Sequence, residues 1–342
     1  MAFDAEKLGR ELMAAVGEND AETEPTMWID TGYLPLNKII SGDPAKGLPG
    51  GRMIEIAGPS ASGKTLLATM AMIAAQKAGG IAIFIDWEVA FNKTFAEQLG
   101  LNTAFPYFIY KRAETWEEGN MMAMKTAEAL RSKKLIPDDA PIMAVFDSIA
   151  AAVPKSMMYD SKGARREIDE YTMNDTTALA RVTSTTLKSI NQYVGRFNMT
   201  AIYLNQIRTK PGVVYGDPRT TPGGGAMEFY ASCRLFTGRK KIFDGTGSDK
   251  EFTGSLIGME TVKNKLTRPF QNVDLRLMYD DAGRAVFDFT TGYIEELVAA
   301  KKLEEKAGRI TWDGKTYFKT VLSKKLTDEG KLPELVAMYL AK

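Results

Sequence analysis

The sequence of 342 residues contains no histidine and only one cysteine, Cys233. One cysteine cannot form a disulfide within the chain, and without histidine both zinc sites and histidine-based acid/base catalysis are excluded. Proton transfer must therefore use carboxylates, lysine, tyrosine or water. No apolar run is long enough to cross a bilayer, and the first residues mix charges with leucines, unlike a signal peptide. We therefore expect neither membrane insertion nor secretion.

The sequence also has almost no net charge, because 44 basic residues and 43 acidic ones leave a formal charge of +1. The two ends differ, however: residues 1–30 carry two bases against eight acids, and residues 299–342 carry ten bases against six acids. Ends of opposite sign fit head-to-tail self-association, a basic surface for nucleic acid, or simple solvated faces, and charge alone does not separate these interpretations.

Short apolar runs that alternate with helical stretches occupy the middle of the chain. Residues 53–57, 81–86, 142–147 and 201–205 predict buried strands, with helices between them that include about 115–134 and 173–196. This alternation predicts an α/β fold in which helices cover both faces of a mostly parallel sheet. Ligands of such folds bind at the carboxyl ends of the strands.

Composition divides the chain into three predicted parts. Residues 1–30 form a helix over 5–16 and an acidic linker, and residues 31–284 form the α/β core. Residues 285–342 form a small α+β domain, with a helix near 292–306, a hairpin near 312–318 and a closing helix near 333–341. Inside the core, residues 207–225 are rich in glycine and proline without periodicity, which indicates a mobile or functional loop.

Between the first predicted strand of the core and the next helix, residues 58–65 match the phosphate-binding pattern G-x-x-x-x-G-K-[ST]. Its glycines let backbone N–H groups turn toward phosphate oxygens at the positive end of the helix. Lys64 would reach the β- and γ-phosphates, and the Thr65 hydroxyl would hold Mg²⁺. All residues of this loop are candidates for nucleotide binding: Gly58, Pro59, Ser60, Ala61, Ser62, Gly63, Lys64 and Thr65.

Two carboxylates at the ends of other predicted strands complete a candidate hydrolytic site. Asp147 ends the strand 142–147, where a nucleotide site of this kind needs a second ligand for its metal ion. Glu88 follows the strand that ends at Asp86. Since histidine is absent, Glu88 is the natural group to polarise an attacking water. The sequence thus predicts nucleotide hydrolysis and leaves open what the hydrolysis drives.

Several further segments occur in a characteristic order: Gly-Leu-Pro-Gly-Gly-Arg at 47–52, Phe-Ile-Asp-Trp-Glu at 84–88, Phe-Asp-Ser-Ile-Ala-Ala at 146–151, Asn-Gln-Ile-Arg at 205–208 and Val-Lys-Asn-Lys at 262–265. Together with the loop at 58–65, they resemble the RecA family of ATP-dependent recombinases. The resemblance spans about residues 30–275 and implies a RecA-like P-loop NTPase core. The compact size and the glycine triplet at 223–225 are also similar to phage-encoded recombinases of the UvsX kind.

The resemblance implies roles at the nucleotide. Glu88 matches the family's catalytic glutamate, Asp147 its Mg²⁺-associated aspartate, and Gln206 the residue that senses the γ-phosphate. Phe95 stands where the family stacks a tyrosine on adenine, and Asn92 where an aspartate contacts the exocyclic amine. Lys263 and Lys265 match lysines that reach a neighbouring subunit's ATP, as arginine fingers do in trans. ATP and Mg²⁺ are the cofactors that this implies.

DNA contacts follow from the same resemblance. Residues 207–225 correspond to one DNA-binding loop, residues within 155–177 to another, and three polar residues of the following helix to phosphate contacts. The candidate DNA-binding residues are Arg181, Ser184, Lys188, Arg208, Lys210, Tyr215, Thr220, Gly223, Gly224 and Gly225.

The sequence therefore favours a DNA-dependent ATPase that forms a head-to-tail helical filament on single-stranded DNA and exchanges strands with homologous duplex DNA. Residues 1–30 would serve this self-association. The alternatives are a RecA-like ring helicase and an ATP-gated polymerising scaffold. A cytoplasmic, nucleoid-associated place in a bacterial cell, without a membrane partner, is the expected location.

Overall fold

The structure is a computed structural model, which describes residues 4, 6, 10, 11, 13, 14, 24–170, 177–210, 212, 216–245, 249–280 and 282–341. The predicted N-terminal helix over 5–16 falls largely outside these residues, as does the start of the helix predicted at 173–196. Tyr215 also lies outside them.

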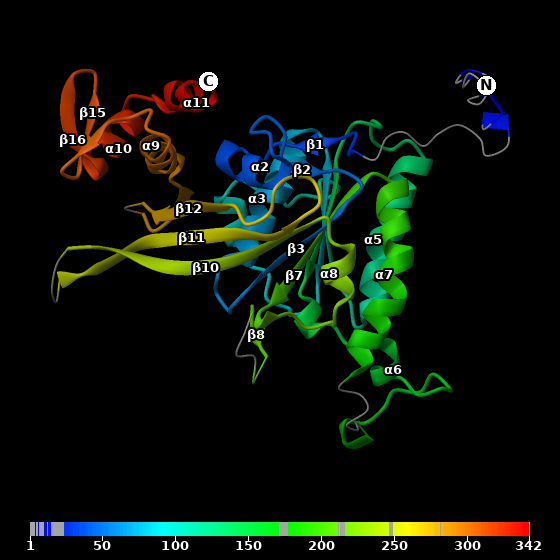
Figure 1. Ribbon diagram of the computed structural model, residues 1–342. Helices are drawn as coiled ribbons and strands as arrows, with labels where there is room; N and C mark the ends of the chain where they lie inside the picture. The colour runs from blue at the N-terminus through cyan, green and yellow to red at the C-terminus, as the bar shows by residue number, and fades with distance from the viewer. Residues whose placement is uncertain are drawn as a thin grey trace.

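Within the described residues, nine strands form one central sheet (Figure 1). In chain order these are β3 (Met53–Gly58), β4 (Ile81–Asp86), β5 (Phe108–Arg112), β6 (Ile142–Asp147), β7 (Met199–Gln206), β10 (Cys233–Asp244), β11 (Glu251–Asn264), β12 (Asn272–Tyr279) and β13 (Ala285–Phe287). Across the sheet they follow the order β13-β12-β11-β10-β3-β7-β6-β4-β5. The strands from β10 to β5 pair in parallel, and β11, β12 and β13 extend the sheet in antiparallel fashion.

Helices cover both faces of the sheet. Successive residues of its buried strands point to opposite faces, so both faces are apolar and must be covered. In β4, Phe84 packs in the same cluster as α3 (Lys64–Lys77) and α2 (Leu34–Ser41). Its neighbours Ile83 and Ile85 pack in a second cluster with α5 (Trp116–Ser132) and α7 (Ala178–Arg196). The fully buried strands therefore consist almost entirely of apolar residues, as the sequence predicts.

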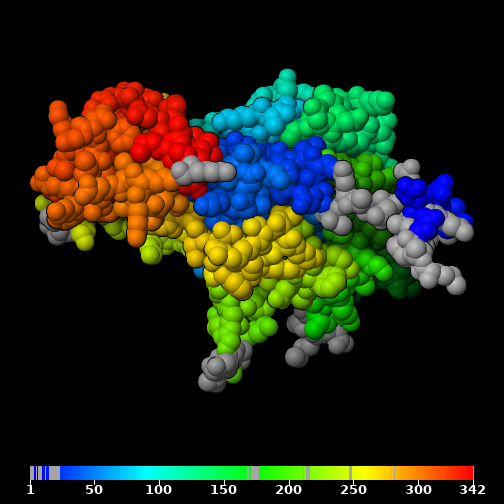
Figure 2. Space-filling view, turned by 45° about the horizontal axis from the view of Figure 1, so that its top comes forward, coloured from blue at the N-terminus to red at the C-terminus, as the bar shows by residue number. Residues whose placement is uncertain are grey.

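Shorter elements lie at the ends of this core. A small ladder pairs β1 (Trp28–Ile29) with β2 (Leu48–Pro49). At one end of the molecule, beyond β12, lie α9 (Phe289–Ala299), α10 (Lys319–Asp328), α11 (Leu332–Leu340) and the sheet of β14 (Glu305–Lys306), β15 (Arg309–Trp312) and β16 (Lys315–Phe318) (Figures 1 and 2). The core also contains α4 (Lys93–Gln98), α6 (Lys155–Met158) and α8 (Ala226–Tyr230), together with 3₁₀ turns at Ile149–Ala151 and Ile168–Glu170.

Most of the predicted elements are confirmed, and some are corrected. The strands at 81–86 and 142–147 have the predicted bounds, and the hairpin near 312–318 is present as β15 and β16. The helix predicted near 292–306 is wrong in its second half. It ends at Ala299, because the chain turns at Lys301, which has a φ of 58° that a right-handed helix does not allow. The strand β14 follows. The loop 207–225 is not wholly irregular, since β8 (Arg208–Thr209) pairs with β9 (Arg219–Thr220) inside it.

The packing of α5 on the sheet explains Trp87, an unusual residue beside Glu88. Its buried ring stacks on Trp116 and Phe146, with centroids 5.6 and 6.0 Å away, and its Nε1 donates to the carbonyl oxygen of Thr115 at 3.1 Å. This close approach requires a glycine in the helix. A Cβ atom on Gly119 would lie 2.5 Å from Cζ2 of Trp87.

We therefore expect Gly119→Ala to lower the free energy of unfolding by roughly 1–2 kcal/mol, because overpacking against Trp87 outweighs the gain in helix propensity. Gly195→Ala is the matched control, since Gly195 also lies in a helix but has open space at its Cβ position. This control should be neutral or slightly stabilising in urea denaturation. Equal stabilities of the two variants would contradict this view of the packing.

Candidate functional site

The candidate nucleotide-binding loop, residues 58–65, joins β3 to the N-terminus of α3 and lines a pocket of about 280 Å³. Ala61 and Gly63 adopt positive φ angles of 57° and 92°. A Cβ atom on Gly63 would lie 2.7 Å from Cδ1 of Ile257, so both the backbone angle and the space require glycine there. The loop thus wraps closely around the start of the helix, where backbone N–H groups attract phosphate.

Lys64 lies in this pocket and folds back over the loop. Its Nζ donates to the carbonyl oxygens of Gly58 and Pro59, at 3.1 and 2.8 Å. Burial lowers the pKa of Lys64, although the nearby Asp147 and Glu88 carboxylates act in the opposite direction. A phosphate group in the pocket would therefore offer this partly desolvated ammonium a better partner than two carbonyls.

Thr65 and Asp147 meet beneath the loop, as the metal-binding prediction requires. The Thr65 hydroxyl donates to Oδ2 of Asp147 at 3.0 Å. Burial, together with the charge of Glu88, raises the pKa of Asp147 to about 7. Among the described residues, no group of three His, Cys, Asp or Glu side chains is placed to hold a metal. The pair fits a Mg²⁺ ion that takes its other ligands from phosphate and water.

Glu88 lies on an exposed turn at the edge of the same pocket. The hydroxyl of Ser148, the residue after Asp147, donates to Oε1 of Glu88 and fixes this carboxylate. The turn itself is held by buried Asp86, which accepts hydrogen bonds from the N–H of Val89 at 2.6 Å and the N–H of Phe91 at 3.2 Å. Asp86 is therefore a structural group that positions Glu88.

The predicted base-binding residues lie at one end of the pocket. Phe95 lines it, whereas Asn92 caps the helix α4 and accepts the N–H of Phe95 at 2.9 Å through Oδ1. Asn92 thus holds the segment that carries Phe95, and its Oδ1 already has one donor. Tyr279, at the end of β12, also lines the pocket, and the sequence analysis did not identify it.

Arg239 is a second pocket residue that the sequence analysis missed. It lies on β10, donates from Nε to Oγ of Ser255 at 2.9 Å, and reaches the carbonyl oxygen of Ala61 from Nη1 at 3.4 Å. Its guanidinium therefore contacts the outside of the nucleotide-binding loop. Arg239 belongs to a run of basic residues that follows an apolar stretch, and this run could have marked it as a candidate. Local patterns, however, do not reveal that this strand lies beside β3.

Gln206 connects the pocket to the long loop. It is the last residue of β7, pairs in register with Gly58 of β3, and lines the pocket. The loop 207–225 begins immediately after it.

Lys263 and Lys265 are not brought into this pocket. Their Nζ atoms both donate to the carbonyl oxygen of Phe229, at 3.0 and 2.9 Å, and Lys263 also donates to the carbonyl oxygen of Glu228. Burial, followed by the charge of Lys265, lowers the pKa of Lys263 to about 8. The two lysines thus form a separate basic pair at the end of α8.

Some candidate DNA-binding residues lie on the hairpin of β8 and β9, which projects from one side of the molecule (Figure 1). The chain that follows α6 extends on the same side (Figures 1 and 2). Arg208 and Lys210 are exposed on the hairpin. Arg181, Ser184 and Lys188 are exposed along one face of α7, while buried Thr183 donates to the carbonyl oxygen of Gly223 at 2.6 Å.

Other loop residues are less open. Gly223 and Gly224 have positive φ angles of 89° and 72°, and Gly223 is buried whereas Gly224 and Gly225 are exposed. Thr220, in β9, is half-buried. Arg219, beside it, pairs with Asp217 at 2.8 Å and Glu260 at 2.9 Å.

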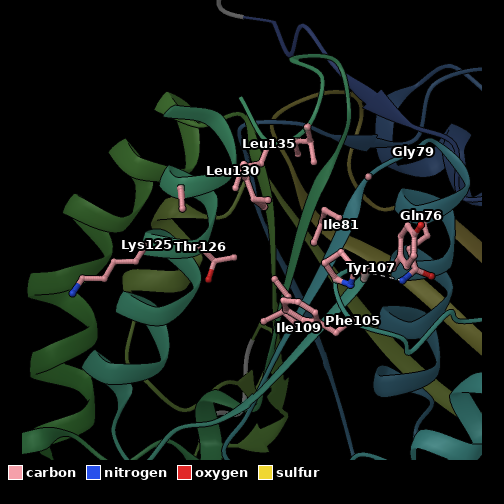
Figure 3. Close-up of a pocket in the computed structure, with 14 residues that line it drawn as sticks. Gln76, Gly79, Ile81, Phe105, Tyr107, Ile109, Lys125, Thr126, Leu130 and Leu135 are labelled. Carbon is pink, nitrogen blue, oxygen red and sulfur yellow. Dashed lines mark hydrogen bonds between the residues drawn. The ribbon is translucent and has the colours of Figure 1, made fainter. Parts of the chain in front are cut away.

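A larger pocket, of about 680 Å³, lies elsewhere, between α5 and the starts of β4 and β5 (Figure 3). Its lining is mainly apolar, with Phe105, Ile109, Leu130 and Leu135 among the side chains. It lacks the carboxylates and backbone donors of a nucleotide site, so its size does not make it the catalytic centre.

In the described part of the chain, no helix combines the length and apolar character that a bilayer span needs.

Comparisons with known proteins point in the same direction as the geometry. The family model of the RecA N-terminal domain matches residues 4–283. A RecA protein of Lactococcus lactis subsp. cremoris strain MG1363 is 33% identical over 327 residues, which cover 93% of this chain and 78% of the relative. RecA proteins of Chloroherpeton thalassium and Streptococcus equi subsp. zooepidemicus strain MGCS10565 are 32% and 36% identical, over 88% of this chain and 75% and 72% of their own lengths.

The position of Arg239 generates a test of the pocket. We expect Arg239→Gln to weaken ATP binding about fivefold, because one screened positive charge beside the phosphates is lost. Lys241→Gln removes the same charge two residues further along β10, outside the residues that line the pocket, and should leave the affinity unchanged. Titration with a fluorescent ATP analogue measures both, and equal affinities in the two variants would show that Arg239 has no role there.

Proposed function

Because this chain belongs to the RecA family and is an ATP-dependent DNA recombinase, we propose that the pocket around residues 58–65 drives its action on DNA. The protein uses ATP and Mg²⁺, forms a helical filament on single-stranded DNA, and catalyses pairing and strand exchange with homologous duplex DNA. The ring helicase and the polymerising scaffold remain the less supported alternatives, since the matching relatives are RecA proteins.

One observation carries the assignment of the site. Gln206 lines the nucleotide pocket and is also the residue from which the exposed, basic hairpin segment begins. A change at the phosphates can therefore reach the loop through one residue. Roles for the loop residues Arg208 and Lys210 are supported by their exposure. Roles for Arg181, Ser184 and Lys188 on α7 are supported by their exposure and by the contact between Thr183 of the same helix and Gly223 of the loop.

The side chains of the pocket divide the hydrolytic work. Lys64 and the backbone N–H groups of the loop bind the phosphates and hold the nucleotide. Mg²⁺, when bound by Thr65 and Asp147, offsets phosphate charge. Glu88, held by Ser148, orients a water molecule and takes its proton, since no histidine exists to do so.

Lys263 and Lys265 act in this proposal on the nucleotide of a neighbouring subunit. They lie outside the pocket of their own chain, and in a head-to-tail contact their charge would complete the site of the neighbouring subunit. Hydrolysis would then require the head-to-tail contact.

We also propose the division of the chain into residues 1–30, which serve self-association, a core at 31–284, and a small domain at 285–342. The helices and the sheet beyond β13 gather at one end of the molecule, which supports a separate C-terminal domain, whereas β13 (Ala285–Phe287) itself belongs to the central sheet (Figure 1). The relatives are bacterial proteins, which supports a location in the bacterial cytoplasm, at the nucleoid.

Electron microscopy with single-stranded DNA and a non-hydrolysable ATP analogue tests the function. We expect open helical filaments for the unmodified protein and none for Lys64→Ala, which loses the phosphate contact. Glu88→Gln should bind ATP within twofold of the unmodified protein and form filaments, yet lose at least about a hundredfold in turnover. Closed rings, or the absence of any assembly on DNA, would contradict the proposal.

The lowered pKa of Lys263 generates a pH test. A lysine with a pKa of about 8 loses its positive charge as the pH rises through that value, so DNA-dependent hydrolysis should decline above pH 8. Lys263→Arg keeps its charge at higher pH and should move the decline upward by at least one unit, relative to its own maximum rate. Lys240→Arg, an exposed change outside both sites, should leave the profile unchanged. Superimposable profiles for all three proteins would remove Lys263 from the mechanism.

A further inference from the structure

A buried charged network lies directly behind the nucleotide-binding loop. Glu55, in β3, is completely buried, and it pairs in register with Arg234 of β10, whose side chain is 8% exposed. Nε of Arg234 donates to Oε2 of Glu55 at 2.5 Å, and Nδ2 of Asn205 donates to Oε1 of Glu55 at 2.8 Å. Both oxygens of this carboxylate are therefore used, which a buried charge requires.

The same network holds both ends of the loop 207–225. At its start, the N–H of Gln206 donates to Oδ1 of Asn205 at 2.9 Å. At its end, Nδ2 of Asn205 donates to the carbonyl oxygen of Pro222 at 3.0 Å, and Nη2 of Arg234 donates to the Thr221 hydroxyl at 3.2 Å.

We propose that Glu55, Arg234 and Asn205 form a coupling hub that makes the single-stranded DNA affinity of the loop 207–225 depend on the nucleotide in the pocket. These are positioning residues, since they are buried behind the pocket and do not line it. The inference rests on the proposed function, in which this loop binds DNA, and it adds the residues that carry the nucleotide state to the far end of the loop.

The physical basis is that no member of the hub can move alone. A shift of Gln206 changes the hydrogen bond that Asn205 accepts, and Asn205 uses its amide nitrogen for both Glu55 and Pro222. If the end of the loop moves, Nη2 of Arg234 loses its hydrogen-bond partner, the Thr221 hydroxyl. Because Arg234 is buried, water does not readily replace this partner. Since unpaired buried polar groups are costly, the network favours arrangements in which both ends move together.

Contacts of β9 also connect the loop 207–225 itself to the hub. Arg219 of β9 lies over the ring of Phe236 at 4.8 Å, and Arg234 lies over the same ring at 5.4 Å. The loop is thus packed against β10 immediately beside the hub. Thr237, the next residue of β10, shares a hydrogen bond of 2.7 Å between its hydroxyl and that of Ser62 in the nucleotide-binding loop. One strand therefore contacts both functional loops.

Two mild substitutions test the hub without leaving a buried charge unpaired. Thr221→Val is close in shape and removes the hydroxyl that Arg234 contacts. Arg234→Lys keeps a positive charge beside Glu55, but its single nitrogen cannot span both Glu55 and Thr221. Thr200→Val is the matched control, because it removes a buried hydroxyl from the opposite end of the same strand as Asn205, where it bonds to the carbonyl oxygen of Pro49 at 2.9 Å.

The measurement is the affinity of a fluorescent single-stranded oligonucleotide, with a non-hydrolysable ATP analogue and, separately, with ADP. We expect the ratio of the two affinities to fall about tenfold toward one in Thr221→Val and Arg234→Lys, the usual scale of a lost charged hydrogen bond. Nucleotide affinity without DNA and thermal stability serve as readouts of a merely structural effect, and nucleotide affinity should stay within twofold. Thr200→Val should keep the ratio of the unmodified protein.

The outcomes separate the hub from the function on which it rests. An unmodified protein that binds no single-stranded DNA with either nucleotide would overturn the proposed function together with the hub. An unmodified protein with a clear nucleotide dependence, which both variants retain, would overturn the hub alone. A ratio that falls equally in Thr200→Val would also overturn it, because the effect would then follow from any lost buried hydroxyl.

Discussion

The site depends on three buried carboxylates on parallel strands: Glu55 lies within β3, and Asp86 and Asp147 end β4 and β6. Glu55, Asp86 and Asp147 are 0%, 1% and 6% exposed, and each must find partners because a buried charge without them is strongly unfavourable. Glu55 accepts hydrogen bonds from Asn205 and Arg234, which in turn contact the end of the loop 207–225. Asp86 accepts hydrogen bonds from the turn that carries Glu88, and Asp147 accepts one from Thr65. The need to pair each buried charge therefore fixes one functional segment of the site.

Strand order arranges these segments in a row. Across the sheet β10, β3, β7, β6 and β4 are neighbours, so Thr237, Gly58, Gln206, Asp147 and Asp86 succeed one another along one edge. The loop 58–65 thus lies beside the strand that leads into the loop 207–225. The proposed nucleotide and DNA sites share this edge because both follow the carboxyl ends of parallel strands, where the loops of such folds converge.

The sequence could predict features that depend on neighbouring residues, but not those that depend on contacts between residues far apart in the chain. The strands at 81–86 and 142–147 and the nucleotide-binding loop are local patterns, so their bounds and most of their chemistry were accessible. The contact of Arg234 with Glu55 joins residues 179 positions apart, and it exists only because β10 lies beside β3. Arg239 was missed for the same reason. β5 and the antiparallel strands of the central sheet were not predicted, since their alternation with polar residues resembles loop sequence. The role of Trp87 could not be predicted, because it depends on stacking against the ring of Trp116 in another element.

The length of β11 bears on the role of the two lysines. Ser255 and Ile257 of this strand line the nucleotide pocket, whereas Lys263 lies toward its other end. An antiparallel strand rises about 3.4 Å per residue, which places Lys263 about 20 Å from Ile257, well beyond the reach of a lysine side chain. A lysine that acts on ATP from this place must therefore act on a nucleotide held by another copy of the chain. If the two lysines act as proposed, β11 separates the two halves of the catalytic site, and hydrolysis is a property of the assembled filament.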